Sequence, residues 1–287
     1  MAIEDHWVLS RLATVTDEVT SLLNVYKFDA ATRTLREFVW NEFCDWYLEM
    51  IKPRLREEML KPAAQRVLVT VLDTTLRLLH PFTPFITEEL WQRLKEIAPS
   101  RGLPAPTPAA DAIIIAPWPT GLEAWRDTAL EARFQRLQEL IVAVRNMRGT
   151  YNISPAVTVA ISVRCSSEVA ADLEHVRSQF EGLAKATLTA TGPDVARPKA
   201  SGSFSFGDAV GFLPLEGLID LQAELARQQK EADKLRGFIA GTERKLGNES
   251  FVAKAPPEVV AEVRETLAGQ KKQLTSIEEI IQQLGEG

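Results

Sequence analysis

The chain has 287 residues, of which 45% are hydrophobic and 25% charged, an ordinary composition for a soluble globular protein of roughly two or three domains. Its net charge of −6 excludes binding of nucleic acid by bulk positive charge, so such a contact would need local basic clusters. The sequence contains neither a long apolar run nor a signal peptide pattern, so no membrane span or secretion is expected. Cys44 and Cys165 lie far apart, which argues against a zinc site or disulfides and favours the cytoplasm.

Four amphipathic helices are predicted in the first hundred residues. The apolar spacing places them at 4–27, 30–52, 63–79 and from Pro84 onwards. Asp29 is expected to cap the second helix and Thr83 the fourth, while Pro53 kinks or ends the second. The predicted inward face of the second helix consists of Leu35, Val39, Phe43, Trp46 and Met50. Four helices with short connections indicate an antiparallel bundle over residues 1–97.

The middle of the chain changes character twice. Residues 98–121 are rich in proline and are expected to form a linker without helix, in which Ile113–Ile115 and Trp118 dock on the bundle. Residues 122–148 again show helical spacing. Alternating apolar residues then predict strands at 157–163, 185–191 and 207–214, with a helix at 167–182. Residues 122–216 should therefore form a helix followed by a small α/β module.

The last segment, residues 217–287, carries two apolar ladders with heptad spacing. The first ladder is Leu218, Leu221, Leu225, Gln228, Ala232, Leu235, Ile239, Thr242 and Leu246. The second is Val260, Val263, Leu267, Gln270, Leu274, Ile277, Ile281 and Leu284. Gly247 can end the first helix, and Pro256–Pro257 suit the start of a second. The two ladders should fold back on each other as an antiparallel coiled-coil arm, about 45 Å long from its helical rise.

Segments from along the whole chain resemble the C-terminal region of valyl-tRNA synthetases. In chain order they are Asp5–Leu12, Phe38–Glu49, Leu79–Trp91, Ala116–Pro119 and Val144–Arg148. The middle segments are similar to valyl, isoleucyl and leucyl enzymes alike. The run Asn248–Val260 resembles the hairpin tip of the arm that lies against the elbow of the tRNA in valyl enzymes. The resemblance implies a mainly α protein with a helical anticodon-binding domain, a small junction module and a tRNA-binding arm.

The sequence also departs from that family. The two signature motifs with which class I synthetases form an aminoacyl adenylate are missing, and His6, His80 and His175 are isolated. No catalytic residue, metal site or cofactor is therefore predicted in this chain, and ATP is expected in the catalytic core of the parent enzyme. The chain is expected to be inactive alone, either as the C-terminal region of a longer ligase or as a free-standing protein of appended domains.

The resemblance suggests where tRNA would touch the bundle. Lys52, Arg54 and Arg56 form a basic cluster that could pair with phosphates of the anticodon stem, or simply be a solvated face. Trp40 and Asn41 could contact unpaired anticodon bases, because such bases are commonly stacked on aromatic side chains. Core packing is the alternative for Trp40.

Further candidates lie on the arm and at the junction, where a tRNA elbow would be read through shape and backbone. The arm candidates are Lys230, Lys234, Arg244, Lys245, Lys254 and Arg264. Phe251 either closes the hairpin or forms a platform for the elbow. Arg145 and Arg148 could reach RNA or satisfy the last carbonyls of their helix.

The expected partners are a valine-specific tRNA and the catalytic core of the synthetase, with the chain itself a monomer. Two alternatives remain at this point. A coiled coil can also serve a scaffold protein that binds a helix of another chain, and the shared motifs fit an isoleucyl or leucyl relative. A ladder that turns back on itself leaves less of its seam for a partner helix. The folding of the arm therefore discriminates between a tRNA-binding protein and a scaffold protein.

Overall fold

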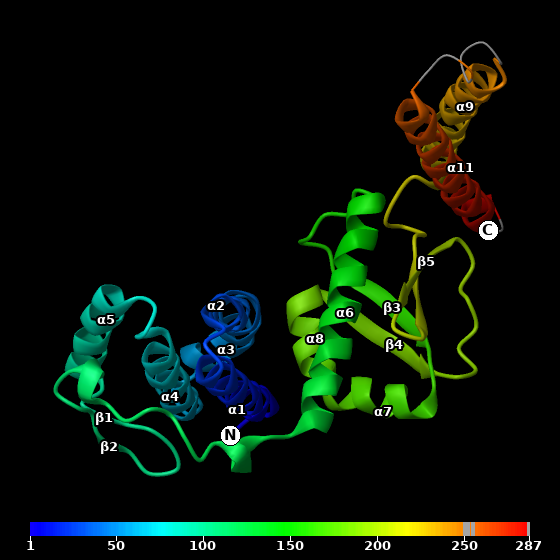
Figure 1. Cartoon of the computed structure of the whole chain (residues 1–287). Helices are drawn as coiled ribbons and strands as arrows, with labels where there is room; N and C mark the ends of the chain where they lie inside the picture. The colour runs from blue at the N-terminus through cyan, green and yellow to red at the C-terminus, as the bar shows by residue number, and fades with distance from the viewer. Residues whose placement is uncertain (249–252, 254–255, 286–287) are drawn as a thin grey trace. The chain divides into compact units, whose positions relative to one another are not determined.

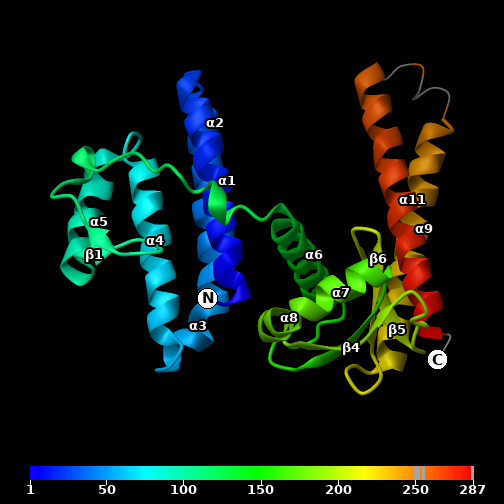
Figure 2. The same ribbon diagram turned by 90° about the horizontal axis from the view of Figure 1, so that it is seen from below.

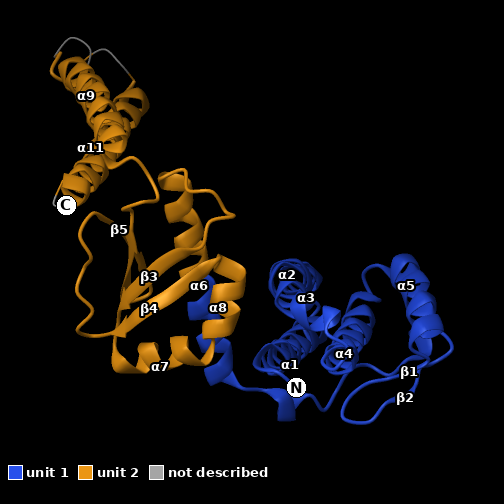
Figure 3. Cartoon of the chain, turned by 180° about the vertical axis from the view of Figure 1, so that it is seen from behind, with its two compact units in different colours: residues 1–138 blue, residues 139–287 orange. Residues whose placement is uncertain are grey.

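A computed structural model describes residues 1–248, 253 and 256–285 of the chain. It forms two compact units, residues 1–138 and 139–287 (Figure 3). The boundary falls inside helix α6, Thr128–Thr150, because Phe134 of α6 stacks on Trp7 with ring centroids 4.9 Å apart. The sequence predicts four ranges, 1–97, 98–121, 122–216 and 217–287, whereas the structure divides into two units within the third range. Among the described residues, no helix has both the length and the apolar character needed to span a membrane.

The first unit is built on a helical bundle (Figure 1). Its helices are α1 Ile3–Asn24, α2 Phe28–Glu37, η1 Phe38–Tyr47, α3 Leu48–Arg56, α4 Lys61–Leu79 and α5 Pro84–Ile97. The four predicted helices are confirmed, and α1 contacts α2, η1 and α4. The predicted cap at Asp29 is wrong, because Asp29 lies in the first turn of α2. Thr83 occupies the N-cap position of α5 as predicted, but its hydroxyl donates to the Leu79 carbonyl and makes no capping hydrogen bond with α5.

The second predicted helix contains a ten-residue π-helix, η1. A π-helix bonds residues five apart, so Phe38 and Phe43 share its buried face and Tyr47 follows. The inward face predicted from α-helical spacing is wrong at Val39 and Trp46, which are only half-buried. The change of register leaves Trp40 67% exposed.

The proline-rich segment after α5 is more ordered than predicted. It contains a short hairpin of β1 Ser100–Arg101 and β2 Thr107–Pro108, and the 3-10 helices η2 Ile113–Ile115 and η3 Glu123–Trp125. Trp118 docks as expected, because its indole N–H donates to Thr20 at 2.9 Å. Of the three isoleucines only Ile113 is buried, in a cluster with Trp91. Ile114 and Ile115 are 74% and 69% exposed, so their predicted docking is wrong.

The second unit begins with an α/β module. Its elements are β3 Val159–Arg164, α7 Ser167–His175, α8 Arg177–Ala184, β4 Ala186–Gly192, β5 Ser201–Phe206 and β6 Ala209–Pro214. The strand order is β4-β3-β6-β5, with β3 and β4 parallel and the other pairs antiparallel. The three predicted strands are confirmed. Strand β5 was not predicted, because its serines and glycine resemble a turn. Gly211 of β6 is required by packing, since a Cβ there would lie 2.2 Å from the Phe204 ring.

The arm consists of α9, Leu221–Leu246, and α11, Pro257–Gly285 (Figure 2). Asp220 caps α9 by accepting hydrogen bonds from two backbone N–H groups. The predicted seam is confirmed, with its core at Ala232, Leu235, Ile239 and Ile277. Three pairs across the helices fix an antiparallel register: Arg236–Glu278 and Lys271–Glu243 at 2.7 Å each, and Thr242–Gln270 at 3.2 Å. α11 also contacts β5 of the module.

Candidate nucleic-acid interface

One face of α9 carries a regular row of cations and glycines. Lys230, Lys234, Gly237, Gly241 and Arg244 follow in steps of four, three, four and three residues, and all are exposed. The buried seam of α9 has the same rhythm displaced by two residues, so the two rows lie about 200° apart around the helix. We name this row the α9 outer stripe. It faces away from α11 along the length of the arm.

The stripe is basic although the arm as a whole is acidic. Two of the neighbouring acids are held in ion pairs, since Asp233 binds Arg236 and Glu243 binds Lys271, each at 2.7 Å. The stripe lysines and Arg244 have no ion pair with any described residue. A phosphate backbone approaching this face would therefore meet positive charge first.

Packing does not explain the two glycines of the stripe. A Cβ added to Gly237 or Gly241 would meet no atom within 4 Å. Glycine inside a helix costs about 1 kcal/mol relative to alanine. A glycine leaves space on the surface of the helix, because a residue without a side chain lets another backbone come close. The sequence analysis missed these glycines, and their spacing relative to the lysines was the signal that could have found them.

The remaining arm candidates lie elsewhere. Arg264 of α11 is exposed beside the seam, and Lys245 is exposed next to the stripe and has contacts of its own. Lys254 and Phe251, predicted at the hairpin tip, lie outside the described residues. The structure therefore brings Lys230, Lys234 and Arg244 together and leaves Arg264 on the second helix.

On the bundle, Trp40 and Asn41 lie side by side and exposed on η1. An exposed tryptophan beside an amide offers a stacking surface and a hydrogen-bonding group. Lys52 and Arg56 lie further along the same helical run and are also exposed. Lys52 binds Glu49 at 2.5 Å, an exposed pair that a phosphate could replace at little cost.

Arg54 is a correction to the predicted basic cluster. Its guanidinium binds Asp5 through both oxygens and Glu4 at 2.8 Å, and its side chain is only 13% exposed. The Tyr47 hydroxyl also donates to Asp5, at 2.9 Å. The hydrogen bonds that Arg54 donates to Asp5 raise the pKa of the guanidinium further above its ordinary value. Arg54 therefore joins α3 to α1 and is not available to RNA.

Arg148 is a second correction. It is 5% exposed and donates to the carbonyls of Ser154, Val157, Ala184 and Lys185. Burial without an acidic partner lowers its pKa. Neither predicted role is confirmed, because Arg148 is too buried to reach RNA and the carbonyls that it satisfies lie outside its own helix. Arg145 is exposed and donates weakly to Leu183 at 3.4 Å.

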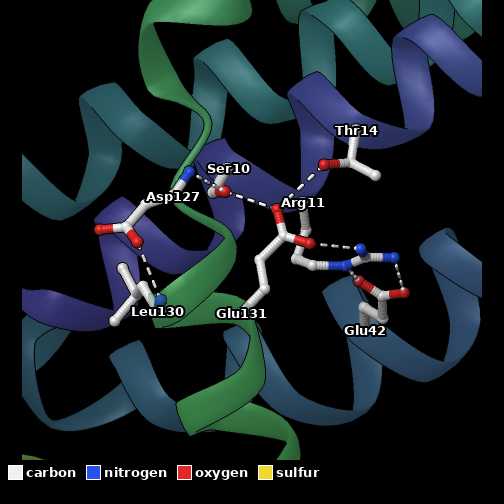
Figure 4. Close-up of polar contacts among 7 residues, drawn as sticks. All are labelled: Ser10, Arg11, Thr14, Glu42, Asp127, Leu130 and Glu131. Atoms are coloured by element: carbon white, nitrogen blue, oxygen red, sulfur yellow. Dashed lines mark hydrogen bonds and ion pairs between the residues drawn. The ribbon is translucent and has the colours of Figure 1, made fainter.

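A charged network joins η1 to α1 and α6 (Figure 4). Arg11 of α1 binds Glu42 of η1 through two nitrogens at 2.6 and 2.9 Å, and Glu131 of α6 at 2.7 Å. Ser10 and Thr14 donate to the other oxygen of Glu131 at 2.5 and 2.9 Å. Burial alone would raise the pKa of Glu131, but the hydrogen bonds from Ser10 and Arg11 outweigh it, so this pKa is lowered. The network fixes the helix that carries Trp40 and Asn41.

Comparison with known proteins agrees with this arrangement. The family described as the anticodon-binding domain of tRNA ligase matches residues 5–163, and the chain belongs to that family. The family described as the valyl tRNA synthetase tRNA binding arm matches residues 220–285, which include both arm helices. The anticodon-binding bundle and the arm predicted from the sequence are thus confirmed as family assignments.

The chain is also similar to complete ligases. The chain is 40% identical over 99% of its length to a valine–tRNA ligase of Rhodopirellula baltica, and 38% identical over 92% to one of Bacillus subtilis. It is 36% identical over 98% of its length to a valine–tRNA ligase of Thermotoga maritima. It spans only 28%, 29% and 30% of these relatives, in their C-terminal region.

Proposed function

We propose that this chain is the tRNA-binding part of a valine–tRNA ligase. The α9 outer stripe is the observation that carries the proposal, because it gives an acidic protein a row of three exposed cations with room for a phosphate backbone at the two glycines between them. The stripe would hold the elbow of the tRNA through its backbone. Trp40 and Asn41, with Lys52 and Arg56 on the same helical run, would contact the anticodon stem-loop.

The proposal includes partners and specificity. The tRNA is valine-specific, as the names of the relatives suggest. The chain acts with a catalytic core that binds ATP and forms the aminoacyl adenylate, which is what the resemblance to class I synthetases implies. The chain is a monomer apart from that core, because α9 and α11 cover each other's seam. The same closed seam weighs against the scaffold alternative, and the match of the arm to valyl enzymes weighs against isoleucyl or leucyl ones. The cytoplasmic location expected from the sequence stays a prediction.

The experiment is a salt titration of tRNA binding. Dissociation constants for a valine tRNA transcript are measured at several salt concentrations with the unaltered chain and with a variant carrying Lys230→Gln, Lys234→Gln and Arg244→Gln. Each phosphate contact contributes about 0.7 to 0.9 to the slope of log K against log salt. We expect the variant to bind more weakly. The magnitude of its slope of log K against log salt should decrease by the amount expected for two to three phosphate contacts.

The matched control is Lys272→Gln, which removes an exposed cation of α11 that lies off the stripe. It should leave the slope unchanged. Equal slopes for the unaltered chain and the stripe variant would overturn the proposal, and so would an equal loss in the control.

A further inference from the structure

The polar contacts between α1 and η1 depend on the π-helical register of η1. The Tyr47 hydroxyl donates to Asp5 at 2.9 Å. Arg11 donates to both carboxylate oxygens of Glu42, at 2.6 and 2.9 Å (Figure 4). Glu42 and Tyr47 are five residues apart, and in an α-helix their side chains would point about 140° away from each other. A π-helix bonds residues five apart and places them on one side, so only this register lets both side chains reach α1.

The buried face of η1 repeats with the same spacing. Phe38 and Phe43, also five residues apart, are 0% and 6% exposed. The backbone N–H of Leu48 donates to the carbonyl of Phe43, which is again five residues earlier. A π-helix of ten residues is uncommon, because most π-helical segments are single-turn bulges. The rest of the structure must therefore hold η1 in this register.

The ion pair between Arg11 and Glu42 is built to hold it. Both side chains are largely buried, at 24% and 22% exposure, and their contact is bidentate. A bidentate pair of this kind is stronger than neutral hydrogen bonds and restricts orientation as well as distance. The third nitrogen of Arg11 binds Glu131 at 2.7 Å, so the guanidinium is fixed from a second side. Glu42 is thus tied to a group that cannot follow it if the helix turns.

The register decides where the RNA-facing side chains of η1 point. In an α-helix, Trp40 would lie about 60° from Phe43 around the axis, at the edge of the buried face. In a π-helix each residue turns by a smaller angle, so Trp40 lies further from Phe43. Its exposure of 67% agrees with this position, and Asn41 beside it is exposed as well.

We propose that Arg11 and Glu42 are positioning residues for RNA binding. Their ion pair keeps η1 in the π-helical register and thereby keeps Trp40 and Asn41 on its outer face. Loss of the pair lets η1 take the α-helical register, in which Trp40 turns towards the bundle. The inference rests on the proposed function, because it names what orients the surface that would contact the anticodon stem-loop.

The first test needs no RNA and uses the whole chain. The readout is the indole N–H signal of Trp40 in a ¹H–¹⁵N NMR spectrum, assigned with Trp40→Phe, and its broadening by an uncharged gadolinium chelate. Glu42→Met removes the carboxylate but keeps the length of the side chain, and the Trp40 signal should lose most of its broadening. Glu42→Gln keeps one acceptor and should lose less of it. This variant carries the test if Glu42→Met does not fold.

The second test measures binding of a valine tRNA transcript. Glu42→Met should weaken binding about as much as Trp40→Ala does, roughly five- to hundredfold for the loss of one stacked base. The variant with both changes should bind no more weakly than Trp40→Ala, because the two residues act through one contact. Asp45→Asn is the control, since Asp45 is an exposed acid of the same helix. It should change neither the broadening nor the affinity.

The outcomes separate this inference from the proposed function. Unchanged broadening of the Trp40 signal in both Glu42 variants would overturn the inference, and so would additive losses of affinity in the variant with both changes. An equal effect of Asp45→Asn would also overturn it. Failure of the unaltered chain to bind tRNA would overturn the proposed function and with it the RNA role, while the broadening would still decide whether the ion pair holds the register.

Discussion

Neighbouring arginines of α3 have opposite roles although the sequence shows them as one cluster. Arg54 is tied to Asp5 and Glu4, about fifty residues earlier in the chain, whereas Arg56 is exposed. Charge is visible in a sequence, but the partner of a charge depends on tertiary packing. The same limit explains Arg148, which looked like an RNA contact and is buried among carbonyls.

Replacing Arg54 with alanine should destabilise the protein by about 3 to 5 kcal/mol, because it removes the cation that is paired with the buried carboxylates of Asp5 and Glu4. Arg56→Ala should change stability by less than about 0.5 kcal/mol but weaken tRNA binding. Urea unfolding and a tRNA titration measure the two effects. Equal stability of the two variants would contradict the structural role given to Arg54.

Glu131 makes stability depend on pH in a defined direction. Its pKa in the folded protein lies below the ordinary value of 4.5, so its contribution is complete above that pH and is lost as the pH falls through the folded pKa. Glu131→Gln should therefore cost most stability near pH 6 and progressively less below about pH 4.5. Unfolding free energies at a series of pH values measure this. A constant difference between the two proteins would contradict the account.

At the scale of elements, regular periodicity was predictable and irregularity was not. The heptad seams of α9 and α11 follow directly from leucine and isoleucine spacing, and all three predicted strands form. The π-helix η1 breaks the 3.6-residue rule, so the predicted face was wrong at Val39 and Trp46. Strand β5 was not predicted, because serine and glycine have weak strand propensity. Its pairing with β6 stabilises the strand instead.

The π-helix has a functional consequence that can be measured. Because η1 leaves Trp40 67% exposed, Trp40→Ala should alter stability by less than about 0.5 kcal/mol. If Trp40 stacks on an anticodon base, tRNA binding should lose about 1 to 3 kcal/mol. Phe43→Ala is the contrasting variant, since Phe43 is buried on the same element and its loss should cost stability. Unchanged tRNA affinity of Trp40→Ala would remove Trp40 from the interface.

The glycines of the α9 outer stripe allow a test in which stability and binding move in opposite directions. Gly237→Gln with Gly241→Gln should stabilise the helix by roughly 1 kcal/mol, because glutamine has the better helix propensity. The added side chains should at the same time weaken tRNA binding by filling the space that a backbone would use. Thermal unfolding and a tRNA titration measure the pair. Tighter or unchanged binding would show that the glycines serve no close approach.

A matched control is available on the second helix. Gly269 of α11 is exposed, and an added Cβ there would also meet nothing within 4 Å. Gly269→Gln should stabilise α11 in the same way without weakening tRNA binding. If it weakens binding as much as the stripe variant does, the effect is not specific to the outer face of α9.

For the whole molecule, the two units supply two separate surfaces, the exposed face of η1 and α3 and the α9 outer stripe. The division into a helical bundle, a module and an arm was predictable from the sequence, because each has its own periodicity. The boundary inside α6 was not predictable, because it depends on the stacking of Trp7 on Phe134. We propose that both surfaces engage one tRNA molecule.

A hydroxyl-radical footprint of the chain on a valine tRNA transcript tests that claim most directly. Protection is expected in two separate regions, the anticodon stem-loop and the elbow, and the variant with Lys230, Lys234 and Arg244 changed to glutamine should lose the elbow protection alone. Protection of a single region, or a simultaneous loss of both in that variant, would contradict the account.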